Sequence, residues 1–215
     1  MIKLEKIILI LAFIGLIIKF TLLPMSSTLF ALSVSFLSLL YWPMGFALLN
    51  RIGFRQIFKK DSYQGLSSLR IIGSIGTGMA LSALCLGILF KLLNFPGGNS
   101  ILIIGLVTVF TAVIPVLIKL MKTKEEFYAG LMKRIVVFGC IGIVALCLSD
   151  LAITKIRYHN YPEYIKAYEL YLQNPQDMAN TKKLDMEYKR ATMSKIEFED
   201  YQSILKKTEK HHKGQ

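Results

Sequence analysis

Apolar residues gather in five long runs up to residue 154, and short polar segments separate these runs. A helix that crosses the hydrocarbon core of a membrane needs about 20 mostly apolar residues. Because each run approaches that length, the pattern predicts an all-α, polytopic integral membrane protein with about five transmembrane helices. The runs are 7–23, 28–49, 71–93, 101–118 and 135–154.

The first four runs contain an internal repeat, in which a glycine, a lysine and two prolines recur 72 residues later. The pairs are Gly15 and Gly87, Lys19 and Lys91, Pro24 and Pro96, and Pro43 and Pro115. The repeat predicts two helical hairpins, 7–49 and 71–118, which a fifth span at 135–154 completes into a transmembrane domain over 1–154. We expect Pro43 to kink or end its helix, because proline lacks an N–H donor.

Composition agrees with insertion in a membrane and indicates an orientation. The chain of 215 residues is 53% hydrophobic, with a mean hydropathy of +0.49, which is more apolar than soluble domains usually are. Lys and Arg gather before the first run and after the second and fourth runs, and such loops stay cytoplasmic. We therefore expect a multi-pass protein of the bacterial inner membrane with a cytoplasmic N-terminus. The turns at 24–27 and 94–100 and the tail would then be extracytoplasmic.

The net charge of +12 follows from this topology and from attraction to an anionic inner leaflet, so nucleic acid is not an expected partner. Arg51, Arg55 and Lys59 recur every four residues, and Lys60 follows them. This spacing predicts a short amphipathic helix on the lipid surface. A solvated basic loop is the alternative.

Three ionisable residues fall inside the apolar runs, where charge is costly and often functional: Lys19, Lys91 and Asp150. One interpretation is that both lysines extend to the outer membrane interface while Asp150 meets water near its helix end. Another is that Asp150 pairs with Lys19 or Lys91 and holds the fifth helix against the hairpins. The third is a charged site for an ion, a proton or an acidic group of a partner.

Small residues in the third and fifth runs predict close helix packing: Gly73, Gly76, Gly78, Gly139 and Gly142. The segment 73–78 resembles a phosphate loop only in its glycines, because no Lys-Ser or Lys-Thr pair follows it. The spacing of Cys, His and acidic residues predicts no metal site. No cofactor and no catalytic residue are expected either.

The polar tail, 155–215, is predicted to be helical in three pieces. Its first piece carries a stripe of tyrosines at helical spacing, and Asn174 and Pro175 end it. Ser194 and Glu197 form the pattern of a capping box before the last piece. The stripe predicts either a small helical core or a contact with a partner, and its members are Tyr161, Tyr164, Tyr168 and Tyr171.

The second hairpin also carries a family resemblance, through Gly87, residues 89–91, Phe95 and residues 104–108. These residues resemble the transmembrane hairpin of GldL, a motor protein family of gliding motility and type IX secretion in Gram-negative inner membranes. In that family an acid thought to work with the proton gradient follows the Gly-Leu-Val-Thr segment, but here Val109 stands there and Leu37 stands in the duplicate. The stretch 188–205 resembles more loosely the short C-terminal helical domain called SHOCT.

The resemblance carries over Lys91, and Lys19 through the repeat, but not the proton-coupling acid. It therefore implies a scaffold or accessory subunit rather than a motor. The sequence as a whole predicts a non-enzymatic membrane protein whose tail contacts a partner, either another membrane or extracytoplasmic protein or a second copy of the chain. The alternative is a small transporter or ion-conducting protein that uses Lys19, Lys91 and Asp150.

Overall fold

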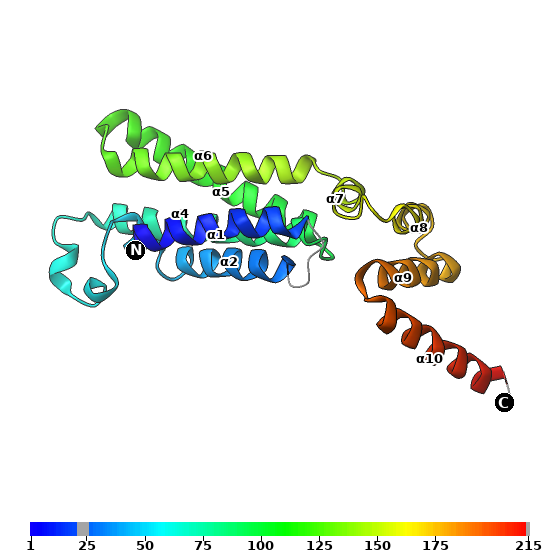
Figure 1. The fold of residues 1–215 in the computed structure, drawn as a ribbon. Helices are drawn as coiled ribbons and strands as arrows, with labels where there is room; N and C mark the ends of the chain where they lie inside the picture. Colours follow the sequence, from blue (N-terminus) through cyan, green and yellow to red (C-terminus); the bar gives the residue numbers. More distant parts are fainter. Residues whose placement is uncertain (21–25, 214–215) are drawn as a thin grey trace. The chain divides into compact units, whose positions relative to one another are not determined.

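The computed structural model describes residues 1–20 and 26–213 and divides the chain into two units, Met1–Asp150 and Leu151–Gln215 (Figure 1). Helices are the only regular elements among the described residues, which confirms the all-α prediction. The division falls at Asp150, a few residues before the predicted start of the tail at 155.

The first unit consists of two helical hairpins and a further long helix. The first hairpin joins α1 (Ile2–Lys19) to α2 (Ser26–Tyr41), and the second joins α4 (Ser68–Leu92) to α5 (Gly98–Thr123). The further helix, α6 (Glu126–Cys147), packs on α4 and α5 (Figure 1). Helix α4 is central because it contacts α2, α5 and α6, and its Leu81 and Leu84 are fully buried.

The two ends of this unit differ in charge. We call the end where α4 begins and α5 ends the basic end, since Arg51, Arg70, Lys122 and Arg134 lie there. We call the other end the turn end, because α4 turns into α5 there near Gly97. Lys19 lies in the last turn of α1 and Lys91 in the last turn of α4, both at the turn end.

Three helices of the described residues are long and apolar enough to cross a membrane: α4, α5 and α6. Helix α2 is apolar but shorter, and α1 carries Lys3, Glu5, Lys6 and Lys19 within its 18 residues. The structure thus supports a membrane protein with three such helices, whereas the prediction of about five is not borne out by length and composition.

The two hairpins differ in the effect of their repeated proline. Helix α2 ends at Tyr41, and a turn with Pro43 leads into the short α3 (Gly45–Leu49), so the run 28–49 is two helices. This confirms the stop expected at Pro43. Its repeat counterpart Pro115 lies inside the continuous α5. The positions 21–25, which include Pro24 and half of the predicted turn 24–27, lie outside the described residues.

The predicted fifth span, 135–154, is also two helices. Helix α6 begins earlier, at Glu126, and ends at Cys147, because Leu148 is extended (φ −77°, ψ 120°). Helix α7 (Asp150–Arg157) then begins at Asp150. This break places the carboxylate of Asp150 in the first turn of a new helix, where an acid is favourable.

The basic segment after α3 is a loop with two short 3₁₀ helices, η1 (Phe54–Gln56) and η2 (Lys60–Tyr63). The amphipathic helix predicted there is wrong, because Gly53 and Lys59 are extended and Arg51 has a positive φ of 60°. The side chains of Arg51, Arg55, Lys59 and Lys60 are exposed, as in the solvated-loop alternative. Phe58 is 95% exposed beside them.

The second unit holds α8 (Pro162–Gln173), α9 (Met178–Thr192) and α10 (Lys195–Lys213). Helix α8 ends directly before Asn174, as predicted. The capping box is confirmed at the start of α10: Ser194 N donates to Glu197 Oε2 at 2.9 Å, and Glu197 N donates to Ser194 Oγ at 3.3 Å. The hydrogen bonds from Ser194 lower the pKa of the Glu197 carboxyl.

Candidate functional site: buried charges that join the helices

Lys91 and Asp150 form a short ion pair at the turn end. The Nζ atom of Lys91 donates to Oδ1 of Asp150 at 2.6 Å. The Lys91 side chain is 3% exposed and the Asp150 side chain is 43% exposed. The predicted pairing of Asp150 with a lysine therefore holds for Lys91, and it ties α4 to the segment that follows α6.

Lys19 is fully buried, with 0% of its surface exposed. Its Nζ atom lies 5.5 Å from the ring centroid of Phe20 and 5.9 Å from that of Phe30, within the range of a cation–π interaction. The interpretation that both lysines extend into the outer interface is wrong, because protein atoms cover Lys19 and Lys91 alike.

Each lysine lies one helical turn beyond a glycine that permits a close helix crossing. A Cβ at Gly15 would lie 2.7 Å from the backbone N of Phe30, and a Cβ at Gly87 would lie 2.6 Å from Cα of Leu102. Only a residue without a side chain allows backbones to approach this closely. The partners Phe30 and Leu102 are themselves 72 positions apart, the same offset that relates the two glycines.

At the basic end, Glu5 joins three helices. Its Oε1 accepts from Tyr41 Oη at 2.6 Å and from Arg134 Nε at 2.7 Å, and its Oε2 accepts from Arg134 Nη2 at 2.6 Å. Glu5 and Tyr41 are buried. This bidentate pair fixes α1 and α2 against α6, because two parallel bonds set orientation as well as distance.

Glu5 and Arg134 were not among the site residues predicted from the sequence. Arg134 lies 129 positions away from Glu5, so no local spacing connects the two. The available signal was that Glu5 stands one helical turn into an apolar helix. Such an acid needs a partner when that helix is packed against others.

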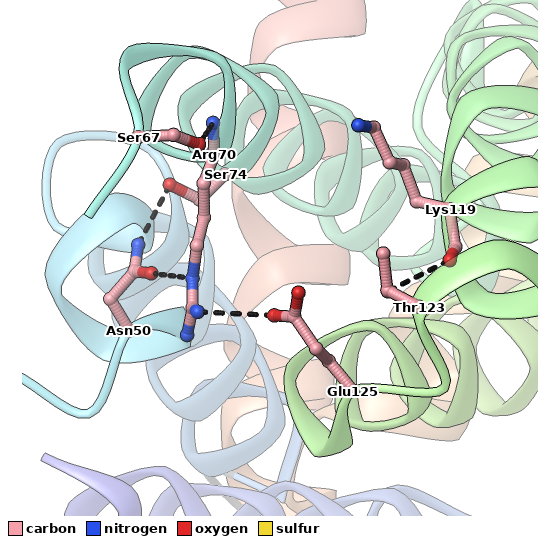
Figure 2. Close-up of polar contacts among 7 residues, drawn as sticks. All are labelled: Asn50, Ser67, Arg70, Ser74, Lys119, Thr123 and Glu125. Carbon is pink, nitrogen blue, oxygen red and sulfur yellow. Dashed lines mark hydrogen bonds and ion pairs between the residues drawn. The ribbon is translucent and has the colours of Figure 1, made fainter. Parts of the chain in front are cut away.

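A second polar cluster at the basic end centres on Arg70 of α4, as Figure 2 shows. Its Nε donates to Asn50 Oδ1 at 2.9 Å, and its Nη1 donates to Glu125 Oε2 at 3.3 Å. The guanidinium lies 4.0 Å from the ring centroid of Phe127. Asn50 Nδ2 also donates to Ser74 Oγ at 3.0 Å, so the cluster joins α3, α4 and the start of α6.

The predicted packing glycines differ in their surroundings. Gly78 faces Tyr41 O, which a Cβ would approach to 2.7 Å, and Gly142 faces Leu84 Cδ1 at 2.9 Å. A Cβ at Gly73, Gly76 or Gly139 would meet no heavy atom within 4 Å. These three positions therefore do not make the close backbone approach expected of them. The spacing of small residues alone did not separate the two groups.

The tail tyrosines form an internal cluster that differs from the predicted stripe. The ring centroid of Tyr164 lies 4.5 Å from that of Tyr158 and 5.8 Å from that of Tyr188. Tyr168 adjoins Tyr164 at 6.3 Å, and Tyr171 adjoins Tyr168 at 6.4 Å.

Burial raises the pKa of Tyr158 to about 12 and raises that of Tyr164 further. The predicted member Tyr161 directly precedes α8 and is 37% exposed. Sequence spacing within one helix could not find Tyr158 and Tyr188, because the cluster joins α8 to α9 and to the residue that follows α7.

The polar groups of the first unit thus connect helices to one another. Among the described residues, no group of three or more His, Cys, Asp and Glu side chains could hold a metal ion. No protein-family model matches the chain, and no curated protein and no solved structure matches it either.

Proposed function

We propose that this chain is a non-enzymatic scaffold or accessory subunit of a membrane complex, whose helices anchor a helical tail that contacts a protein partner. The observation that carries the proposal is the use of charge. The pairs Glu5–Arg134 and Arg70–Glu125 tie α6, or the residue before it, to both hairpins at the basic end. The pair Lys91–Asp150 ties the segment after α6 to the second hairpin at the turn end. Charged groups that are paired with one another in this way make the helix bundle rigid and favour one specific assembly.

We further propose that all five apolar runs lie in a bacterial inner membrane as two repeated hairpins and a fifth helix. The equal spacing of the Gly15–Phe30 and Gly87–Leu102 contacts supports a duplicated hairpin. The basic residues of the loops support a cytoplasmic basic end. The second hairpin carries the resemblance to GldL. Val109 in place of the acid of that family favours an accessory role over a motor role.

Labelling of single cysteines in intact cells tests this topology. Cys85, Cys140 and Cys147 are first replaced by alanine, and single cysteines are then placed at the exposed positions Thr28, Lys60, Asn99 and Gln176. Five spans predict that an impermeant maleimide reaches positions 28, 99 and 176 from outside and reaches position 60 only after lysis. Three spans with a first hairpin on the cytoplasmic side would protect position 28, and labelling of position 60 from outside would reverse the orientation.

The partner role is tested on protein extracted gently from membranes. Exposed apolar side chains of the tail, among them Met178 and Ile196, are the surface that we expect a partner to cover. Cross-linking in membranes followed by affinity capture should recover a second protein, or a second copy of the chain, only when residues 155–215 are present. Capture of the single chain alone, with and without the tail, would contradict the scaffold role.

A transporter or ion-conducting protein is the second candidate, because Lys19 and Lys91 are buried ionisable groups within apolar helices. That function needs at least one of them, or Asp150, to face a path for water. The flux of the transported ion or solute across the membrane of reconstituted vesicles should then fall when Lys19, Lys91 or Asp150 is replaced. Unchanged flux in Lys19→Met, Lys91→Met and Asp150→Asn would exclude it.

A further inference from the structure

A cavity of about 440 Å³ lies between α4, α5 and α6 in the half of the bundle nearest the basic end. It exists because Gly73 and Gly76 of α4 carry no side chains, and a Cβ at either would meet no heavy atom within 4 Å. Near the turn end, α4 and α5 are in contact, and a Cβ at Gly87 would lie only 2.6 Å from Cα of Leu102. Helices α4 and α5 are thus close at one end and leave room at the other.

The wall of the cavity is suited to hydrocarbon. Its threonine hydroxyl groups are already bonded within their own helices: Thr77 Oγ1 donates to Gly73 O, Thr108 Oγ1 to Gly105 O, and Thr111 Oγ1 to Val107 O, each at 2.8 Å. These threonines therefore offer mainly their methyl groups. Apart from two cations, the rest of the wall is lined by leucine, valine, alanine and proline side chains and by the rings of Phe127 and Tyr128.

The charged residues that line the cavity are both cations, Arg70 of α4 and Lys119 of α5. The Asn50, Glu125 and Phe127 contacts hold the guanidinium of Arg70 in place, and its remaining N–H donors can serve a further acceptor. The Lys119 carbonyl accepts from Thr123 Oγ1 at 2.9 Å, while its side chain extends away from that bond (Figure 2). The carboxylate of Glu125 lies 3.3 Å from the guanidinium of Arg70 and is engaged by it.

We propose that a phospholipid with a net negative charge, from the leaflet at the basic end, occupies this cavity. Arg70 and Lys119 hold its phosphate, and the first part of an acyl chain lies along Gly73 and Gly76. Basic pockets between membrane helices on the cytoplasmic side are suited to such head groups. The inference rests on the proposed insertion in a membrane.

The combination of features selects a lipid over a free phosphate compound. A soluble anion would be satisfied by the two cations and would leave the apolar part of the cavity without a ligand. Residues 70–77 rise about 10 Å along α4, so the site leads from the charged mouth well into the apolar part of the helix. The outward-facing neighbours Leu69 and Ile72 are apolar and largely exposed, as expected for a site that opens toward lipid.

The test measures lipid retained by the purified full-length protein, reconstituted with phosphatidylglycerol or phosphatidylcholine and analysed by native mass spectrometry. We expect phosphatidylglycerol to be retained about tenfold more than phosphatidylcholine, and Lys119→Gln to lower this preference about fivefold through one lost cationic contact. Gly76→Leu should abolish retention of either lipid by filling the cavity. Two matched controls, Lys122→Gln for charge and Gly139→Leu for size, should behave as the wild type.

Several results would overturn the inference. They are equal retention of the two lipids by the wild type, a Lys122→Gln loss as large as that of Lys119→Gln, and full displacement of the lipid by excess inorganic phosphate. Cysteine labelling reports insertion independently of lipid retention. A correctly inserted protein without lipid preference therefore contradicts this inference alone and leaves the proposed function intact.

Discussion

The ammonium group of Lys91 and the carboxylate of Asp150 lie 2.6 Å apart although 59 positions separate them in the sequence. Their environments are unequal, because Lys91 is 3% exposed while Asp150 is 43% exposed. Asp150 retains access to solvent, and Lys91 depends on its partner. The energetic consequences of removing either residue should therefore differ.

We predict that Asp150→Ala destabilises the protein more than Lys91→Met. The first change leaves a buried ammonium group without its counter-charge, which costs about 3 kcal/mol. The second removes the buried charge itself and leaves a carboxylate that water can reach, at a cost of about 1 kcal/mol or less. Unfolding of the detergent-solubilised protein measures both.

The double variant Lys91→Met/Asp150→Ala provides the decisive comparison, since coupling between neighbours appears as non-additivity. It should be about as stable as Lys91→Met alone. Asp200→Ala, at an exposed position of the tail, is the control and should change stability little. Additive losses in the double variant would show that the pair is not coupled.

Tyr41→Phe tests the Glu5 cluster at the other end of the helices. The hydroxyl of Tyr41 donates to an ionised carboxylate in a buried site, so its removal should lower the free energy of unfolding by about 1.5 to 3 kcal/mol. Tyr63→Phe is the comparison, because the Tyr63 hydroxyl donates to the neutral carbonyl of Ile57 and should cost about 1 kcal/mol. Equal losses would argue against an ionised Glu5.

The sequence predicted features that depend on local chemistry. The helix stop at Pro43 and the capping box of Ser194 and Glu197 follow from residues within one or two turns, and the long helices follow from the apolar runs. The pairing of Asp150 with Lys91 was within reach as well, because charges inside apolar runs are few. What remained open was which lysine it would meet.

The sequence could not supply features that depend on packing. Glu5 and Arg134 meet only because three helices converge, and hydropathy does not encode that convergence. The basic segment after α3 has helical charge spacing but also Gly53 and an Arg51 with positive φ, and backbone conformation overrode the charge pattern. Gly76 and Gly87 are alike in sequence, yet one lines a cavity and the other touches a neighbouring helix.

This contrast between glycines predicts opposite effects of one substitution. Gly87→Ala should destabilise the protein by about 1 to 3 kcal/mol, because its Cβ would collide with the backbone of Leu102 and force α4 from α5. Gly76→Ala should be neutral or stabilise by up to about 1 kcal/mol, since alanine favours helix and has room there. Thermal unfolding in one detergent compares them, and similar losses in both would contradict the close α4–α5 crossing.

The tyrosine cluster of the tail predicts a loss of stability at alkaline pH. Burial raises the pKa of Tyr158 to about 12, whereas an unfolded tyrosine titrates near pH 10. The folded state therefore keeps a proton that the unfolded state releases, so this stabilisation is present below about pH 10 and is lost as pH rises toward 12. Tyrosinate absorbance and helical circular dichroism, followed together in the full chain, should show delayed ionisation that coincides with loss of tail helicity.

Phenylalanine variants separate burial from a general effect of alkali. Tyr158→Phe and Tyr164→Phe remove buried groups that must ionise, so each should shift the alkaline transition of the tail to higher pH. Tyr161→Phe changes a residue that is 37% exposed and lies at the start of α8, and it should leave the transition where it was. If Tyr161→Phe shifts the transition as far as Tyr164→Phe does, while Tyr158→Phe does not shift it, then the original stripe stabilises the tail. The cluster of Tyr158, Tyr164 and Tyr188 would in that case not be the stabilising unit.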